Sequence, residues 1–414
     1  MVRDLFKHTG IYFFGSILSK SITTVAWIAL ARLLTPEKYG QFILYIMILE
    51  MTTFIGDFGL NQWYLRNVEK ENRTLIFNKI VYVRSVTLFL SVAILSFILF
   101  YFKIFDLATS SFLLASLIPM SYLSVAEGYY LEQKKGLKVS LKLTSIGGIF
   151  LLGYLLIYKN LDLQKSVLTL FVSLILTLSW FIPWRQIRLV KFLSLSEIFS
   201  ILKSSSSYLY LNLTSFFYNK GDSFIISYFK GNSALGIYGL AYRFLESLSL
   251  FSTSLTQNLF PLSAKKEGVG LKQLLKISLL MFVSGAFVSI FVYFGANFLV
   301  VGLFGLQYSA AIPILRIFAV VLLLFFINAP LATVVQSSRL VKSFLPYGIL
   351  NTLLNILLNI LLVPKFGIIA AAWMMALTEI TGFFINLHFV KKLYSQLYRY
   401  IDLPVRQAGI TVSI

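Results

Sequence analysis

The sequence predicts an all-α polytopic membrane protein. Of its 414 residues, 58% are hydrophobic and only 13% are charged, and the mean hydropathy is +0.83. This composition is far more apolar and less charged than a water-soluble protein needs to form a hydrophobic core. The apolar residues come in runs of about 20 without strand-like alternation, which is the length of a helix that crosses a bilayer. Because backbone groups in lipid must bond within their own segment, helices are expected throughout.

Twelve such runs follow one another along the chain. They lie at residues 11–33, 41–60, 80–102, 107–126, 139–158, 166–184, 208–229, 235–262, 277–304, 311–335, 344–363 and 367–390. The first run follows a basic N-terminal stretch, as in a signal peptide, but it is long enough to span the membrane. We therefore expect an uncleaved first helix.

Lysine and arginine are concentrated in one set of alternate loops and in the span ends beside them. These segments lie at residues 3–7, 66–84, 134–142, 185–203, 265–276, 339–342 and 391–406, so that Arg84 counts among them. The positive-inside rule places this set, and with it both termini, in the cytoplasm. The formal net charge of +20 is then explained by membrane topology, and no nucleic-acid partner is expected.

Little sequence is left for chemistry outside the membrane. The non-cytoplasmic loops are a few residues long, and the chain has no cysteine and two histidines, so a metal site is not expected. Enzyme motifs such as GxSxG and HExxH are absent. We expect a protein that is not an enzyme. The longest loop, a basic segment that ends in serines, predicts two lobes: residues 1–190, a cytoplasmic linker at 191–207, and residues 208–414 with a short cytoplasmic tail.

An internal repeat supports this division. The first two spans are joined by the hinge ARLLTPEKYGQF and end on DFGL, and a shift of 196 residues places Tyr39-Gly40-Gln41-Phe42 on Leu235-Gly236-Ile237-Tyr238. Each half has six spans with the same in/out sense. The sequence thus predicts a parallel repeat of two six-helix lobes, related by an axis along the membrane normal.

Charged residues within four spans are expected to face a central cavity or a partner, since a charge at mid-bilayer costs about 2.5–3.5 kcal/mol on insertion scales. They lie on the repeat-equivalent spans one, two, seven and eight: Lys20, Glu50, Asp57, Lys220, Asp222, Arg243 and Glu246. Structural alternatives exist. Arg243 and Glu246 could neutralise each other at i, i+3 spacing, and Lys20 could pair with Glu50.

Three other polar positions also have two interpretations. Asp57 could be a cavity acid, although a contact at a helix end is favoured. Arg316 could face the cavity or snorkel to the outer interface. Span eleven carries Asn351, Asn355 and Asn359 at four-residue spacing, which suits interhelical packing and, as a second interpretation, sugar binding by Asn355.

Glu379 lies in the middle of span twelve without a cationic neighbour in sequence. A carboxylate in this setting is a candidate proton carrier.

Taken with the spans and the repeat, two segments resemble the polysaccharide-biosynthesis branch of the multidrug/oligosaccharidyl-lipid/polysaccharide exporter superfamily, specifically Wzx-type O-antigen flippases. The segments are ARLLTPEKYGQF with DFGL, and KGDSFIISYFKGNSALGIYGLAYRF (Lys220 to Phe244) leading to Pro261. The resemblance implies a MATE-like fold that moves a glycan linked to undecaprenyl diphosphate by alternating access. It also implies a multi-pass protein of the bacterial inner membrane that serves O-antigen and lipopolysaccharide biosynthesis.

The same resemblance implies roles for individual residues. Lys20, Lys220, Arg243 and Arg316 are the cations that could meet the diphosphate or acidic sugars, while Glu50, Asp222 and Glu379 are candidates for coupling to H⁺ or Na⁺. No other cofactor is expected. The resemblance implies a cavity with a net positive charge. The spans instead hold five acidic residues and four of these basic residues, which departs from that expectation. Membrane lipid and glycan polymerase machinery are the further partners expected.

Two rival functions are open at this level. A cation-coupled drug exporter of the same superfamily would have a similar fold, with a cavity suited to organic cations. A membrane glycan polymerase or glycosyltransferase would act on the same substrate, but it would normally carry a sizeable extramembrane loop with catalytic residues.

Overall fold

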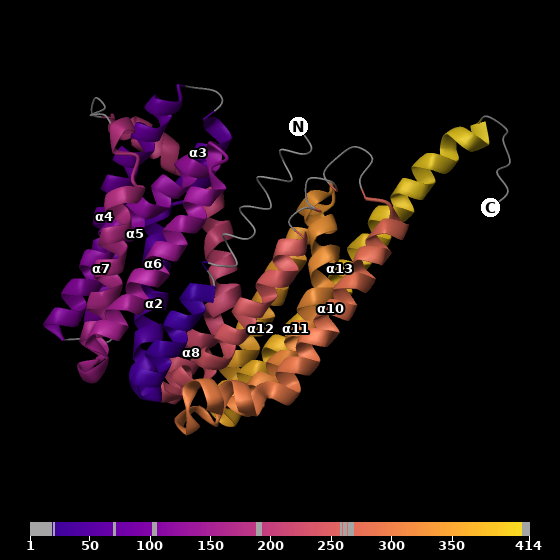
Figure 1. The fold of residues 1–414 in the computed structure, drawn as a ribbon. Coiled ribbons are helices and arrows are strands. Elements are labelled where there is room, and N and C mark those ends of the chain that lie inside the picture. Colours follow the sequence, from indigo (N-terminus) through magenta and orange to yellow (C-terminus); the bar gives the residue numbers. More distant parts are fainter. Residues whose placement is uncertain are drawn as a thin grey trace. The chain divides into compact units, whose positions relative to one another are not determined.

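The computed structural model describes residues 19, 21–68, 72–101, 106–187, 193–256, 259, 263 and 269–407. Within these ranges every regular element is a helix (Figure 1), so the all-α prediction is confirmed. Contacts divide the chain into two compact units, residues 1–239 and residues 240–414. The domain boundary predicted at residues 191–207 stays a prediction.

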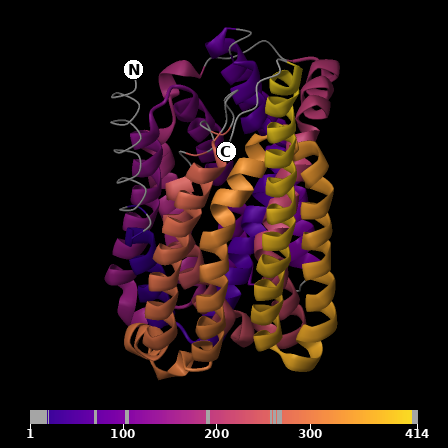
Figure 2. The same cartoon turned by 90° about the vertical axis from the view of Figure 1, so that its right-hand side faces the viewer.

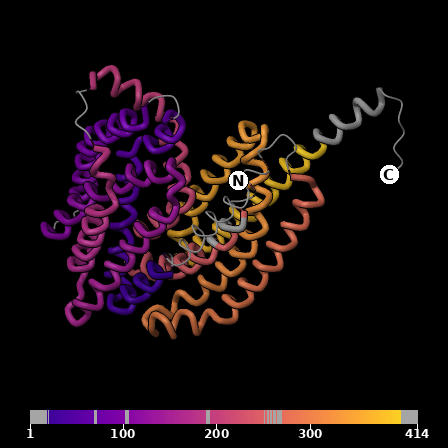
Figure 3. Tube along the Cα trace, turned by 45° about the horizontal axis from the view of Figure 1, so that its top comes forward, coloured from indigo at the N-terminus to yellow at the C-terminus, as the bar shows by residue number. Residues whose placement is uncertain are grey.

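The first unit is a bundle of apolar helices, drawn from indigo to magenta in Figure 3. Its elements are the helix Ser21–Leu33, α2 (Pro36–Asp57), α3 (Leu60–Asn67), α4 (Arg73–Tyr101), α5 (Leu107–Glu132), α6 (Gly136–Ile157), α7 (Leu163–Phe181) and the first part of α8 (Leu195–Thr256). Within the bundle, α2 packs on α4 and α5, while α7 packs on α5 and α6. Helix α2 is thereby held on two sides.

The second unit contains the end of α8 and four long helices. These are α10 (Leu271–Asn297), α11 (Ala311–Ser337), α12 (Val341–Phe366) and α13 (Ile368–Gln407). Helix α11 packs on α10 and α13, and α12 packs on α13, as the orange and yellow helices of Figure 2 show. Their common core includes Leu274, Val334, Val335 and Phe389.

Among the described residues, nine helices are long and apolar enough to cross a membrane, and Ser21–Leu33 is a shorter apolar helix. The chain is therefore a multi-pass membrane protein. Two further predicted spans, 208–229 and 235–262, fall largely within α8, whose helical dihedrals are interrupted at Gly231 (φ 80°, ψ 178°). This backbone region is open essentially to glycine alone, so Gly231 separates the two spans. The count of twelve spans stays a prediction.

Both ends of α2 are formed by local sequence. Thr35 is the N-cap of α2, its hydroxyl accepts the Lys38 backbone N–H at 3.4 Å, and Pro36 is the first helical residue. Proline is favoured there because that N–H has no helical partner. At the other end Phe58 and Gly59 adopt positive φ values of 51° and 75°, which ends α2 before α3 begins.

A capping box starts α8 in the segment predicted to be cytoplasmic. The Ser194 backbone N–H donates to Glu197 Oε2 at 2.8 Å, and the Glu197 N–H donates to Ser194 Oγ at 3.2 Å. The backbone bond from Ser194, followed by the bond from its hydroxyl, lowers the pKa of the Glu197 carboxyl. This reciprocal cap is a sequence-encoded helix start.

Candidate functional site

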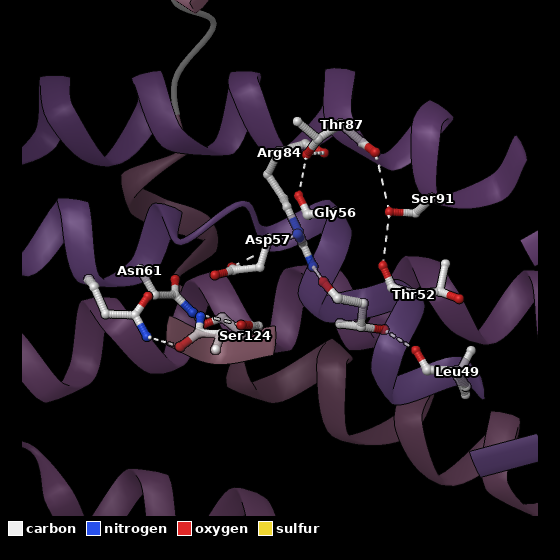
Figure 4. A network of polar contacts seen from close by, with 12 residues as sticks. Leu49, Thr52, Gly56, Asp57, Asn61, Arg84, Thr87, Ser91 and Ser124 are labelled. Carbon is white, nitrogen blue, oxygen red and sulfur yellow. Dashed lines mark hydrogen bonds and ion pairs between the residues drawn. The ribbon is translucent and has the colours of Figure 1, made fainter. Parts of the chain in front are cut away.

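The most deeply buried charges of the first unit lie between α2 and α4 (Figure 4). Asp57 is the last residue of α2, and Arg84 lies about three turns into α4. Their side chains are only 6% and 1% exposed, and Arg84 Nη1 lies 3.9 Å from Asp57 Oδ1. Since either charge alone would be costly in lipid, each offsets the other.

The same arginine also closes the end of α2. Its Nη2 donates to the Thr53 carbonyl oxygen at 3.1 Å, and the Thr87 hydroxyl from the next turn of α4 donates to the Gly56 carbonyl at 2.6 Å. The last carbonyls of a helix lack helical partners and carry partial negative charge. A guanidinium and a hydroxyl from α4 therefore complete this helix end.

Hydrogen-bonding capacity is left over in this network. Arg84 Nε and Nη1 and Asp57 Oδ1 are buried and have no hydrogen-bond partner among the described residues. On the other side of the helix break, Asn61 of α3 donates to Ser124 Oγ at 2.6 Å and to the Ser124 carbonyl at 3.1 Å (Figure 4). The break between α2 and α3 is thus tied to both α4 and α5.

Arg84 is not among the site residues predicted from the sequence, because it lies at the end of the basic segment 66–84, which is predicted to be cytoplasmic. The structure instead buries it completely. Its position near the start of the predicted span 80–102 was the available signal. Asp57, by contrast, occupies the helix-end position that was expected for it.

Asp222 is held by neutral donors. It is 6% exposed, it accepts the Ser223 backbone N–H at 2.6 Å and the Ser223 hydroxyl at 3.2 Å, and the Tyr238 hydroxyl donates to its other oxygen. Tyr238 lies beyond the Gly231 interruption. The carboxylate therefore joins the two parts of α8 within the first unit.

The remaining candidates of the first unit are less enclosed. Glu50 on α2 and Lys220 on α8 are both half-buried. Lys20 lies outside the described residues, so the expected pairing of Lys20 with Glu50 stays a prediction.

In the second unit, Arg243 and Glu246 lie on the part of α8 that follows the interruption. Arg243 Nη1 donates to Glu246 Oε2 at 2.9 Å, and the two side chains are 21% and 32% exposed. The mutual neutralisation that their spacing suggested is present. A half-exposed pair of this kind can still exchange partners, because an exposed ion pair is worth at most about 1 kcal/mol.

Arg316 has a different environment. Its side chain is exposed on α11, and its guanidinium carbon lies 5.7 Å from the centre of the Tyr293 ring on α10. A cation resting on an exposed aromatic ring fits the snorkelling interpretation.

Glu379 on α13 is buried at 5% exposure. Asn328 of α11 donates from Nδ2 to Glu379 Oε2 at 2.8 Å and to the Glu379 carbonyl at 2.9 Å. The amide oxygens of Asn328 and Asn386 are buried without a hydrogen-bond partner in the described part of the chain. A neutral amide of α11 thus holds this carboxylate of α13.

The asparagines of α12 bind its neighbour α13. Asn355 Nδ2 donates to Thr378 Oγ1 at 2.6 Å, and Asn351 Nδ2 donates to the Thr378 carbonyl at 3.1 Å. Asn359 donates back to the Asn355 carbonyl at 2.9 Å. These bonds support interhelical packing, the first of the two interpretations.

The described residues contain no group of three or more His, Cys, Asp or Glu side chains that could hold a metal ion. The apolar helices do carry cations, carboxylates and amides, which can bind charged or polar solutes.

Comparison with known proteins gives a consistent picture. The sequence profile of the polysaccharide biosynthesis protein family matches residues 5–267. The probable low-salt glycan biosynthesis flippase Agl15 of Haloferax volcanii is 24% identical over 276 residues, which make up 64% of this chain and 57% of that relative. The chain thus spans little more than half the length of that curated relative.

Two solved structures share the fold. The lipid II flippase MurJ in an inward closed conformation superposes with a TM-score of 0.74 at 13% identity, over 97% of this chain and 93% of that one. An inward-facing multidrug resistance MATE family transporter of the MOP superfamily gives a TM-score of 0.66 at 14% identity, over 91% and 96%. The predicted likeness to the MATE fold is confirmed.

The pairing of Asp57 with Arg84 yields a testable expectation. Breaking one side leaves a buried charge, so Arg84→Met and Asp57→Asn should each destabilise the protein by about 3 kcal/mol. The double variant should recover part of the loss. Thermal melting of the detergent-purified protein measures all three, with Arg73→Met, which removes an exposed partner of Glu132, as the control. Strictly additive losses in the double variant would contradict a coupled pair.

Proposed function

This chain belongs to the polysaccharide biosynthesis protein family, and from that premise we propose that it is a flippase for lipid-linked glycans. Its substrate is an oligosaccharide on undecaprenyl diphosphate, an O-antigen or related repeat unit. The chain carries this unit across the bacterial inner membrane by alternating access. Twelve spans in two six-helix lobes, with both termini in the cytoplasm, form the transporter.

One observation carries the proposal: charged side chains lie within the apolar helices of a chain with a transporter fold. Asp222 is buried in the first unit, and Glu379 in the second. Charges inside membrane helices are expensive and mark pathways for polar solutes or ions. The Haloferax volcanii relative is a probable glycan biosynthesis flippase, which supports a lipid-linked glycan as that solute.

The diphosphate is the part of the substrate that needs cations. Arg243 can supply one, because its partner Glu246 is only half-buried. A guanidinium matches two phosphate oxygens at once, so a diphosphate can displace the Glu246 carboxylate. In the first unit, Lys220, which is half-buried on α8, and Lys20 are the further candidates for a cation that meets a phosphate.

Transport needs a driving force, and Glu379 is our candidate for ion coupling. Its carboxylate is buried and bonded to the neutral amide of Asn328. A proton or Na⁺ that binds there lowers the cost of a carboxylate charge inside the helix bundle. Glu50 and Asp222 are the further candidates, and Asp222 already has neutral donors around it.

Deletion of the gene tests the function itself. We expect the lipid-linked glycan to accumulate on the cytoplasmic leaflet of the deletion strain, and re-expression of the chain to clear it. Normal delivery to the outer face without a substitute flippase would reject the proposal. Drug susceptibility of the same strain tests the rival exporter: hypersensitivity with normal glycan delivery would favour that function.

Replacement of Arg243 tests the cationic contact. Arg243→Ala should lower glycan export by about tenfold or more, the effect of losing a charge-assisted bond worth at least 1.4 kcal/mol, while Arg243→Lys should retain part of the rate. Arg316→Ala serves as the matched control, because that guanidinium lies on an exposed ring. Membrane levels of each variant are measured alongside. Unchanged export by Arg243→Ala at normal protein level would remove Arg243 from the substrate site.

Removal of the Glu379 charge tests ion coupling. In vesicles, Glu379→Gln should abolish the stimulation of export by an imposed proton or sodium gradient, whereas Glu132→Gln, at a carboxyl paired with exposed Arg73, should keep it. The gradient that stimulates the unmodified chain identifies the ion. Equal stimulation of Glu379→Gln and the unmodified chain would contradict the assignment.

A further inference from the structure

The two hinges of the sequence repeat cross each other at a pair of glycines within the first unit. A Cβ atom added to Gly40 would lie 1.8 Å from the carbonyl oxygen of Asn232, and one added to Gly236 would lie 2.0 Å from the carbonyl oxygen of Pro36. Real Cβ atoms do not approach an oxygen so closely, so each position accepts only glycine in this arrangement. The start of α2 and the part of α8 after Gly231 therefore touch backbone to backbone.

The contact is reciprocal in the register of the repeat. The shift of 196 residues that relates the hinges places Pro36 on Asn232 and Gly40 on Gly236. Gly40 of the first hinge meets Asn232 of the second, and Gly236 of the second meets Pro36 of the first. Such an exchange is what a local two-fold relation between two equivalent segments produces. The repeat predicted from sequence is thus expressed as a contact at its two hinges.

Each hinge is braced within its own half of the repeat. In the first, the Trp27 ring lies 6.2 Å from the Tyr39 ring and 5.6 Å from the Phe42 ring, which ties the helix Ser21–Leu33 to α2. In the second, the Tyr238 hydroxyl donates to Asp222 across the Gly231 interruption. Each hinge and its flanking helices can therefore move as one piece.

At the crossing itself, the two hinges meet through packing contacts of backbone atoms at Gly40 and Gly236. One turn further along, Ile43 packs against Gly239, where an added Cβ would lie 2.6 Å from Ile43 Cδ1. Packing contacts of this kind are individually weak and are lost together when two surfaces separate. The two hinges can therefore separate while the contacts within each half of the repeat stay intact.

We propose that the crossing of Gly40 and Gly236 is the outer gate of this transporter, and that it is closed in this structure. The inference rests on the proposed function, which requires a path to the non-cytoplasmic side, and on the charge distribution, which puts both hinges on that side. The glycines let the two hinges approach closely enough to seal the outer end. Outward release requires them to separate.

The absence of cysteine from the chain allows a reporter without background. Ile43→Cys places one thiol under the crossing, where the native side chain is 5% exposed. A membrane-impermeant maleimide is added to the outer side of sealed vesicles, and the initial labelling rate is measured. No glycan enters this assay, so its result is independent of the substrate. If the deletion strain delivers its glycan normally while the labelling rates change as expected, the flippase function is rejected and the gate is supported.

Alanine at either glycine should hold the gate open. We expect Gly40→Ala and Gly236→Ala each to raise the labelling rate of Ile43→Cys by about tenfold, since a Cβ against a backbone oxygen disfavours the closed state. Gly148→Ala is the matched control, because a Cβ at that position in α6 meets no atom within 4 Å. An unchanged rate in both glycine variants, with melting temperatures equal to that of the reporter alone, overturns the gate.

A cross-link decides the question if neither glycine variant folds. Glu37→Cys and Ser233→Cys are exposed positions related by the same shift of 196 residues, and a short bis-maleimide should join them and stop export. Export at an unchanged rate after complete cross-linking overturns the gate, and so does the failure of the pair to cross-link.

Discussion

The structure depends on one constraint: the hydrocarbon interior offers no water to a polar group, so each buried charge must find its partner within the chain. Arg84 meets this constraint in three ways at once. It lies near the Asp57 carboxylate, it donates to the Thr53 carbonyl, and it places positive charge at the negative end of the α2 dipole. The break between α2 and α3 can exist in the membrane because α4 supplies these partners.

The same constraint separates structural from functional charges. Asp57 and Arg84 are almost fully enclosed, and that pair holds a helix end in place. The side chains of Arg243 and Glu246 are 21% and 32% exposed, so a ligand can replace one member of this pair. Glu379 accepts a hydrogen bond from the neutral amide of Asn328, which suits a group that binds and releases an ion. Transport chemistry is thus expected at the Arg243–Glu246 pair and at Glu379.

Sequence reasoning recovered the features that repeat along the chain. The helical class follows from hydropathy, and the MATE-like fold follows from the resemblance of the hinge segments to a known family. The register of the hinges follows from Tyr39-Gly40 and Leu235-Gly236, whose contact the structure then shows. It could not recover pairings between distant segments. Hydropathy places Arg84 at a span end but does not say which neighbour its side chain meets. The hydrogen bond from Tyr238 to Asp222 forms across the interruption at Gly231. The pattern of polar residues on one face of either span does not predict such a bond.

The central claim is that this chain moves a lipid-linked glycan between leaflets. Reconstitution tests it most directly: purified protein is placed in vesicles with a labelled undecaprenyl-diphosphate glycan in the inner leaflet, and the arrival of the label at the outer leaflet is followed by its accessibility to an external glycosidase. The account predicts that the label becomes accessible with the unmodified chain and stays protected in protein-free vesicles. Equal accessibility in the two preparations, with correctly folded protein present, would contradict it.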